Sequence, residues 1–153
     1  MNKASLASMA LVGLLSGTQL GAQAGSPNMT PVGVTRVTQI RINPGHGDMF
    51  WEDVRKNTRV LWDEYKKRGI MVHYTISTKV TTDDPNDWNV AFTQTYRNWA
   101  ALDDLGVRTD SVSLPHYGSA AARTAAGTAR LQHSTVVASF LIRDQAVNPW
   151  RAP

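Results

Sequence analysis

A long segment with the period of an α-helix stands between two segments with the alternation of β-strands. This change of period constrains the fold more than any other feature of the sequence. Apolar side chains recur at helical spacing from Phe50 to Tyr65, as they do on the buried face of a surface helix. Residues 35–42 are rich in β-branched side chains, and residues 70–80 alternate apolar with mostly polar ones. The pattern predicts a strand–helix–strand unit.

Local sequence marks both ends of this helix. Pro44–Gly47 interrupts the first strand, and Asp48 is suited to cap the first turn by accepting backbone N–H bonds. The basic run Lys66–Arg68 suits the negative end of the helix dipole, and Gly69 is a natural stop. We therefore predict one helix over 48–68.

The turn before this helix has two further interpretations. His46 and Asp48 are metal-ligand residue types, but two residues this close in the sequence are too few by themselves, and the sequence shows no His-rich segment to supply further ligands. We predict no metal site. Binding of an anion at the glycine-flanked helix start stays open as an alternative.

The second half of the chain repeats the first. Residues 88–96 alternate as a strand, 97–105 predict a short helix with Trp99 facing inward, and 134–147 predict the last strand. Between them, 106–133 is less regular and contains an alanine-rich helix, which we interpret as a helical insert. The order strand, helix, strand, strand, helix, strand predicts an α+β, ferredoxin-like βαββαβ fold. Its four-stranded antiparallel sheet is expected to have helices on one face.

The N-terminus indicates export. Lys3 precedes a short apolar run at 9–15, and Ala22-Gln23-Ala24 resembles a signal-peptidase site. The run is shorter than the roughly 20 residues that span a membrane. We predict a signal peptide over 1–24, a flexible leader over 25–34, the folded domain over 35–147 and a tail over 148–153. The mature protein is expected in the periplasm or secreted, without membrane attachment.

Composition excludes several classes of function. The chain has no cysteine, which excludes thiolate catalysis, and a disulfide-free exported domain must hold itself by packing. Its formal net charge is +4, and its basic residues are scattered and form no basic stripe with interleaved aromatic residues. We therefore predict no nucleic-acid partner. Signatures of phosphate loops, serine hydrolases and zinc proteases are absent from the sequence, and we predict no cofactor.

Alternation predicts which side chains lie on the sheet face away from the helices. This open face is expected to carry Gln39, Arg41, His73, Asn89, Thr93, Ser139 and Arg143, with the apolar Met71, Val137 and Leu141 among them. We predict a ligand site in which a guanidinium binds a carboxylate and His73 acts as acid or base. The predicted ligand-binding residues are Arg41, Asn57, His73, Asn89 and Arg143, with Asn57 reaching a cleft below the long helix. The alternatives are that the open-face residues pair across a dimer interface and that Asn57 is merely solvated.

Four segments carry a resemblance to a known family: "QIRINPGHGDMFWEDVRK", "LWDEYKKRGIMVHYTIST", "DWNVAFTQTYRNWAALDDL" and "HSTVVASFLIRDQ". Together they cover roughly residues 35–147. The pattern resembles the dimeric α+β barrel superfamily, particularly its small exported members of unassigned role, and is more distantly similar to antibiotic-biosynthesis monooxygenase-like domains. The resemblance implies a homodimer that packs sheet against sheet. It also implies a ligand either between sheet and helices or inside the shared barrel.

Three functions follow from the residues and the resemblance. The first is an exported small-molecule-binding protein of the dimeric α+β barrel type, without catalysis. The second is a cofactor-independent monooxygenase or isomerase acting on an aromatic or polyketide-like substrate, with His73 or a neighbouring residue moving a proton. The third is a haem-binding protein with His73 as the ligand of the iron.

Overall fold

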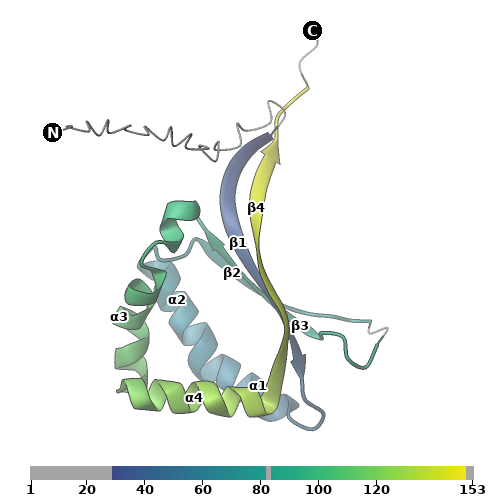
Figure 1. The fold of residues 1–153 in the computed structure, drawn as a ribbon, viewed down its shortest axis with the longest axis vertical. Coiled ribbons are helices and arrows are strands. Elements are labelled where there is room, and N and C mark those ends of the chain that lie inside the picture. Colours follow the sequence, from purple (N-terminus) through teal and green to yellow (C-terminus); the bar gives the residue numbers. More distant parts are fainter. Residues whose placement is uncertain (1–28, 82–83, 151–153) are drawn as a thin grey trace, which may run out of the picture.

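The computed structural model describes residues 29–81 and 84–150, and its helices lie on one side of a single sheet (Figure 1). The elements in chain order are β1 (Met29–Ile42), α1 (Gly47–Asp53), a π-helical turn (Val54–Thr58), α2 (Arg59–Lys67), β2 (His73–Thr78), β3 (Val90–Tyr96), a 3₁₀ turn (Trp99–Leu102), α3 (Leu105–Tyr117), α4 (Ala120–His133) and β4 (Ser134–Val147). Among these described residues, no helix has the length and apolarity needed to cross a bilayer.

The sheet has the strand order β2-β3-β1-β4, and all neighbouring strands are antiparallel. Together with the order of the elements along the chain, this is the ferredoxin-like arrangement, and the predicted fold class is confirmed. β1 pairs with β4 from Met29 opposite Val147 to Ile42 opposite Ser134. The two strands curve together beyond the helices (Figure 1).

β1 begins earlier than predicted. We placed residues 25–34 in a flexible leader, yet residues 29–34 form the first part of the strand. The reason is the length of β4, which offers partners to this segment as far as Val147. The predicted signal peptide and the first four leader residues lie outside the described residues, as does the end of the predicted tail.

The long predicted helix forms over 47–67, but it is not a uniform α-helix. A π-helical turn separates α1 from α2, and the residue before α1 is His46, whose side chain makes no capping hydrogen bond. Asp48 lies within the first turn of α1, so its predicted role as the cap is wrong. The predicted stop at Gly69 is confirmed, because its φ is +66° and the next N–H bonds back to the carbonyl of Tyr65 at 2.9 Å.

The core lies between the helices and the sheet in two clusters. One joins Phe50 and Val54 of the helical segment to Ile40, Val90 and Phe92 of the sheet. The other contains Leu61, Tyr65, Ile70, Met71, Tyr96 and Val112. The apolar stripe that predicted the helix is therefore the stripe that packs on the sheet.

Met71 contradicts its predicted position on the open sheet face. It is 2% exposed and lies in the core. β2 begins at His73, so Met71 belongs to the connection that follows α2, and its N–H bonds to the carbonyl of Tyr65 at 3.4 Å. Alternation cannot predict the direction of a side chain that precedes the strand.

The helical region before β4 also differs from the prediction. Residues 97–105 form only a short 3₁₀ turn, in which the side chain of Asn98 accepts the N–H of Ala101 at 3.0 Å. Asp104 then takes a left-handed conformation with φ of +52°, and α3 begins after it. Trp99 is exposed. The segment interpreted as an insert thus forms α4 and, apart from Leu105, all of α3. These two helices serve as the second helical unit of the fold.

A β-bulge in β4 decides which of its side chains face the helices. Gln39 lies opposite Ala138, whereas Ile40 lies opposite Val136, so Val137 is the extra residue. Beyond it, Ser139 lies opposite Thr38, Leu141 opposite Arg36 and Arg143 opposite Val34, on the helix side of the sheet. Their predicted place on the open face is wrong, because the bulge reverses the alternation. Phe140 and Ile142 occupy that face instead.

Candidate functional site

The five predicted ligand-binding residues do not form one site. Arg41 donates from Nη1 to the backbone and side-chain oxygens of Asn86, both at 3.0 Å. Asn89 accepts the N–H of Ile42 at 3.0 Å. Arg41 and Asn89 line one surface cavity near the connection between β2 and β3, so the structure brings these two together.

His73 lies at the other end of the sheet. It pairs with Thr95, which pairs in turn with Thr35, six positions before Arg41 on β1. Six strand residues span roughly 20 Å, too far for one small ligand to contact both side chains. His73 is exposed, and its Nε2 lies 3.3 Å from the hydroxyl of Thr75. Arg143 is on the opposite sheet face.

Asn57 belongs to a network among the helices. Its Oδ1 lies 2.9 Å from Nε2 of His116, and its Nδ2 donates to Oδ1 of Asp53 at 2.8 Å. Arg130 of α4 donates from Nε to Oδ2 of Asp53 at 2.7 Å and from Nη2 to the hydroxyl of Tyr117 at 3.1 Å. The network therefore joins the π-helical turn and α1 to both α3 and α4.

A cavity of about 480 Å³ lies between the sheet and the helices, within the range that holds small molecules. Its lining is Ile40, Thr58, Leu61, Trp62, Tyr65, Phe92, Thr109, Asp110, Ser113, Tyr117, Arg123 and Arg130. The sheet and the first helical segment supply an apolar wall in which Trp62 packs edge-on against Phe92, with ring centroids 5.2 Å apart. The polar groups come largely from α3 and α4.

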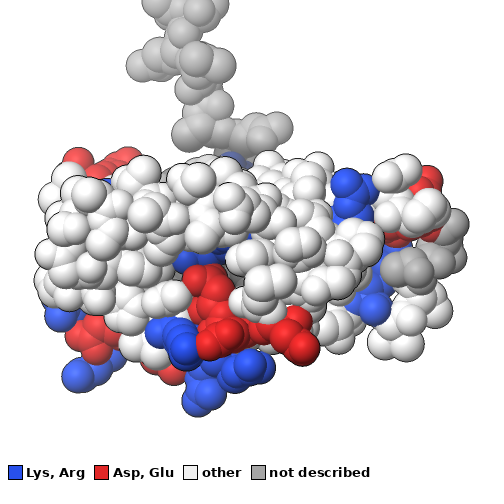
Figure 2. Space-filling view, turned by 90° about the horizontal axis from the view of Figure 1, so that it is seen from below, with Lys and Arg blue, Asp and Glu red and all other residues white. Residues whose placement is uncertain are grey.

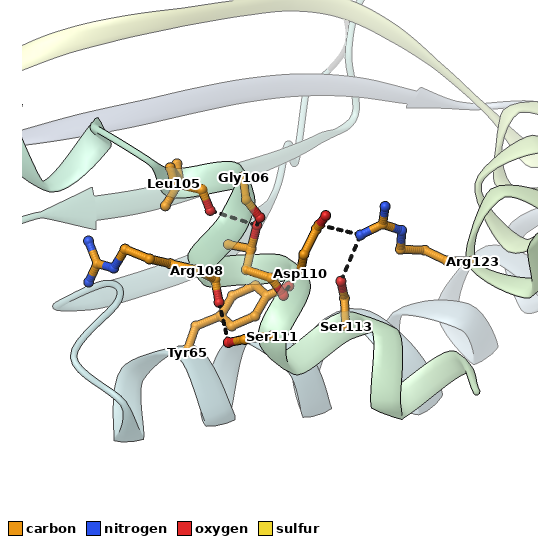
Figure 3. Close-up of polar contacts among 9 residues, drawn as sticks. Tyr65, Leu105, Gly106, Arg108, Asp110, Ser111, Ser113 and Arg123 are labelled. Carbon is orange, nitrogen blue, oxygen red and sulfur yellow. Dashed lines mark hydrogen bonds and ion pairs between the residues drawn. The ribbon is translucent and has the colours of Figure 1, made fainter. Parts of the chain in front are cut away.

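An arginine from α4 organises part of the polar wall. Arg123 forms an ion pair with Asp110 of α3 and donates from Nη1 to the hydroxyl of Ser113 at 3.1 Å (Figure 3). Tyr65 projects from α2 toward α3 (Figure 3). These contacts hold α3 and α4 in a fixed relation beside the cavity.

The charges of the cavity wall are balanced. Arg123 is paired with Asp110, and Arg130 is paired with Asp53. Burial alone would lower the pKa of Arg130, but the hydrogen bond and negative charge of Asp53 outweigh burial and raise it. Both guanidiniums are thus already matched by a carboxylate. On the face seen from below, basic and acidic side chains are intermixed (Figure 2).

Two phenols contribute hydroxyl groups to the cavity. Burial raises the pKa of Tyr65 above its ordinary value, although a hydrogen bond with Ser113 opposes the shift. Tyr65 therefore stays a neutral donor, and its hydroxyl lies 3.5 Å from the carbonyl of Thr109. Tyr117 accepts from Arg130, so the proton of its own hydroxyl is available to a ligand.

The sequence-based search missed these cavity residues. Tyr65 and the apolar lining residues were assigned to the core or to its secondary-structure elements, whereas the polar residues from Thr109 to Arg130 lie in the segment interpreted as an insert. One signal was present: Arg123 and Arg130 are seven residues apart in α4, with only small residues between them. That spacing places two long cationic side chains on one helical face.

The open face of the sheet combines apolar and hydroxyl side chains. Phe140 and Ile142 of β4 are 44% and 43% exposed. Thr35 donates to Asp144 at 2.5 Å and lies 2.8 Å from the hydroxyl of Thr95. Polar groups on this face are thus partly satisfied within the chain, while large apolar side chains are left accessible.

No protein-family model and no curated protein matches the sequence. The chain is similar to a solved structure of HapK from Hahella chejuensis, with 13% identity, coverage of 78% of this chain and 99% of that chain, and a TM-score of 0.49.

Two structures of dimeric ferredoxin-like proteins from an uncultured marine organism are also similar. Their identities are 16% and 7%, they cover 79% and 81% of this chain and 100% and 95% of their own, and each TM-score is 0.47. At such identities a likeness extends to the fold alone. The strand order and the order of the elements in this chain are themselves those of a ferredoxin-like α+β fold.

Proposed function

We propose that this chain is an exported small-molecule-binding protein that acts as a homodimer. Its ligand is an uncharged, planar compound with oxygen acceptors, held in the cavity between the sheet and the helices. The observation that carries this proposal is the composition of that cavity.

The two walls of the cavity suit different parts of such a ligand. Trp62 and Phe92 offer an aromatic surface against which a planar ring can pack. Tyr65 and Tyr117 offer hydroxyl groups to carbonyl or ether oxygens of the ligand. A ligand that contacted both walls would displace water from the apolar surface and would accept hydrogen bonds from the hydroxyl groups.

The charge balance of the wall argues for an uncharged ligand. A carboxylate ligand would compete with Asp110 or Asp53 for Arg123 or Arg130, and it would place a second anion beside each of these carboxylates. A neutral oxygen acceptor adds no such repulsion. The proposed ligand therefore changes from the carboxylate expected from the sequence to an uncharged, oxygenated compound.

Binding without catalysis is the better-supported role. The haem hypothesis depended on His73, and the monooxygenase and isomerase hypotheses depended on His73 or a neighbouring residue. His73 is exposed on the open face and does not line this cavity. The described lining of the cavity contains no histidine, and Nε2 of His116 lies 2.9 Å from Oδ1 of Asn57 in the network among the helices.

A homodimer through the open sheet face would bury apolar side chains that are costly to leave in water. Phe140 and Ile142 project from this face, and Val37 lies between them and β3. In addition, β4 is a long edge strand, which a monomer must otherwise protect. Export rests on the signal-peptide pattern of residues 1–24.

Isothermal titration with matched ligands tests the proposed ligand class. The probes are 1,4-naphthoquinone, naphthalene and 2-naphthoate, which share a ring system but differ in oxygen and charge. We expect the quinone to bind more tightly than naphthalene by roughly five- to tenfold, the value of one hydrogen bond. The naphthoate should bind most weakly.

Two conservative variants locate the hydrogen bond. Tyr117→Phe removes a cavity hydroxyl and should abolish the preference for the quinone. Tyr74→Phe removes a hydroxyl that donates to Asp63 on the outside of α2 at 2.7 Å and should leave the preference unchanged. Equal effects of the two variants, or no binding of any neutral aromatic probe, would refute the proposal.

A further inference from the structure

We propose that His46 and His133 form a binding site for a divalent transition metal, with Cu²⁺ as the preferred ion. Their Nδ1 atoms lie 3.0 Å apart, although the residues are 87 positions apart in the sequence. The site is separate from the proposed ligand cavity and does not depend on it.

The backbone holds the two imidazoles together. His46 ends the loop between β1 and α1, and His133 is the last residue of α4. Asn43 joins the two segments, because its N–H bonds to the carbonyl of His133 and its side chain donates to the carbonyl of Gln132, both at 2.9 Å. The N–H of His46 bonds in turn to the carbonyl of Asn43 at 3.0 Å. The site is thus built on fixed backbone and needs no folding upon binding.

The separation of the nitrogens suits two ligands of one ion. Two bonds of about 2.0–2.1 Å that meet near a right angle place their nitrogen atoms about 3 Å apart. Without metal, the contact requires one imidazole to donate a proton to the other. The ring centroids are 5.3 Å apart, so the nitrogens face each other nearly head-on. To bind an ion, each ring must turn so that both lone pairs meet at one point, and the ring that donates must change tautomer, with its hydrogen moving from Nδ1 to Nε2 through solvent.

The number and kind of ligands favour copper. Within the described residues, no group of three or more His, Asp or Glu side chains is placed to hold a metal, so water must complete the coordination. A two-imidazole site with water suits the tetragonal geometry of Cu²⁺, which also leads the affinity order for nitrogen ligands. A closed tetrahedral zinc site would need four protein ligands.

The charges around the pair are mixed. His133 lines a surface cavity with Glu52 and Asp53 as well as Lys56 and Arg130. Asp53 is matched by Arg130, and Glu52 by Lys56. The cation therefore meets no net repulsion from these four groups.

Isothermal titration with CuCl₂ tests the site, using the full chain purified without a polyhistidine tag and first treated with EDTA. We expect one Cu²⁺ per chain, nitrogen hyperfine structure from two imidazoles in the electron paramagnetic resonance spectrum, and a higher melting temperature when the metal binds. Affinity should be at least tenfold higher for Cu²⁺ than for Zn²⁺.

The chain contains four histidines, which provide matched controls. His46→Asn and His133→Asn should each lose the tight Cu²⁺ site and the two-imidazole spectrum, whereas His73→Asn and His116→Asn should keep both. His46→Gln and His133→Gln serve as second variants if an Asn variant fails to fold by circular dichroism. Retention of tight binding in both pair variants, or equal loss in the His73 control, would overturn the proposal. This outcome is independent of whether the cavity binds aromatic ligands.

Discussion

Replacing Asp53 by Asn should destabilise the chain by removing the charge that holds Arg130. The carboxylate accepts from Nε of Arg130 at 2.7 Å and from Nη2 at 3.4 Å, and it also accepts from Asn57. An amide keeps one acceptor oxygen but places an NH₂ group against the guanidinium or against the Asn57 amide. The variant therefore breaks at least one charge-assisted hydrogen bond at the junction of α1 and α4.

The magnitude follows from the burial of the pair. Removing one partner of a fully buried ion pair costs about 3–5 kcal/mol, whereas an exposed pair contributes about 1 kcal/mol or less. The side chains of Arg130 and Asp53 are 36% and 18% exposed, which places this pair between the two limits. We expect a loss of about 2 kcal/mol, or about 8 °C in melting temperature for a domain of this size.

Urea unfolding followed by circular dichroism measures this loss as a lower midpoint with an unchanged slope. Glu52→Gln is the matched control. It also removes a carboxylate from α1, but this carboxylate is paired with Lys56, whose side chain is largely exposed. Arg130→Met completes a double-mutant cycle with Asp53→Asn. The reasoning is refuted if Glu52→Gln and Asp53→Asn lose the same stability, or if the cycle shows no coupling.

Three further predictions concern the sheet. Phe140→Lys should dissociate the proposed homodimer in size-exclusion chromatography with light scattering, whereas Leu141→Lys, on the other face and similarly exposed, should not; dissociation by both or neither, or a wild-type monomer, would contradict the open-face interface. Burial raises the pKa of the Tyr96 phenol above 10.0. The stability that the buried, neutral phenol contributes is therefore complete below about pH 10 and is lost as pH rises through the higher pKa of the folded chain. Tyr96→Phe should therefore unfold less readily than wild type above pH 10, and an identical alkaline profile would count against this. Gly33→Ala should lower the unfolding free energy by about 1 kcal/mol, because a Cβ would lie 3.1 Å from the Tyr96 carbonyl oxygen. An unchanged midpoint of urea unfolding would contradict this, because it would mean that β1 and β3 shift enough to accommodate the methyl group without cost.

The fold could be predicted because its signals are local. The apolar stripe from Phe50 to Tyr65 and the left-handed Gly69 depend on residues close in the sequence, and both appear in the structure as expected. The last strand also has the predicted bounds, 134–147. These elements in this order suffice to indicate a ferredoxin-like topology.

The candidate site could not be predicted because its determinants are not local. The bulge at Val137 reverses the alternation along β4, and only the register against β1 reveals it. The cavity depends on α3 and α4 standing beside the sheet, and the contacts that hold them there join residues far apart, such as Asp53 with Arg130. The proximity of His46 and His133 has the same origin, since no spacing in the sequence indicates it.

Native mass spectrometry most directly tests whether the cavity holds a small molecule. The chain is purified from the cells that naturally produce it, without added ligand, beside two variants that each introduce a phenylalanine. Thr109→Phe fills the cavity, whereas Thr128→Phe adds the same side chain at an exposed position of α4. The account predicts one neutral aromatic compound per chain in wild type and Thr128→Phe, and none in Thr109→Phe. Equal loading of all three proteins, or bare protein in all three, would contradict it.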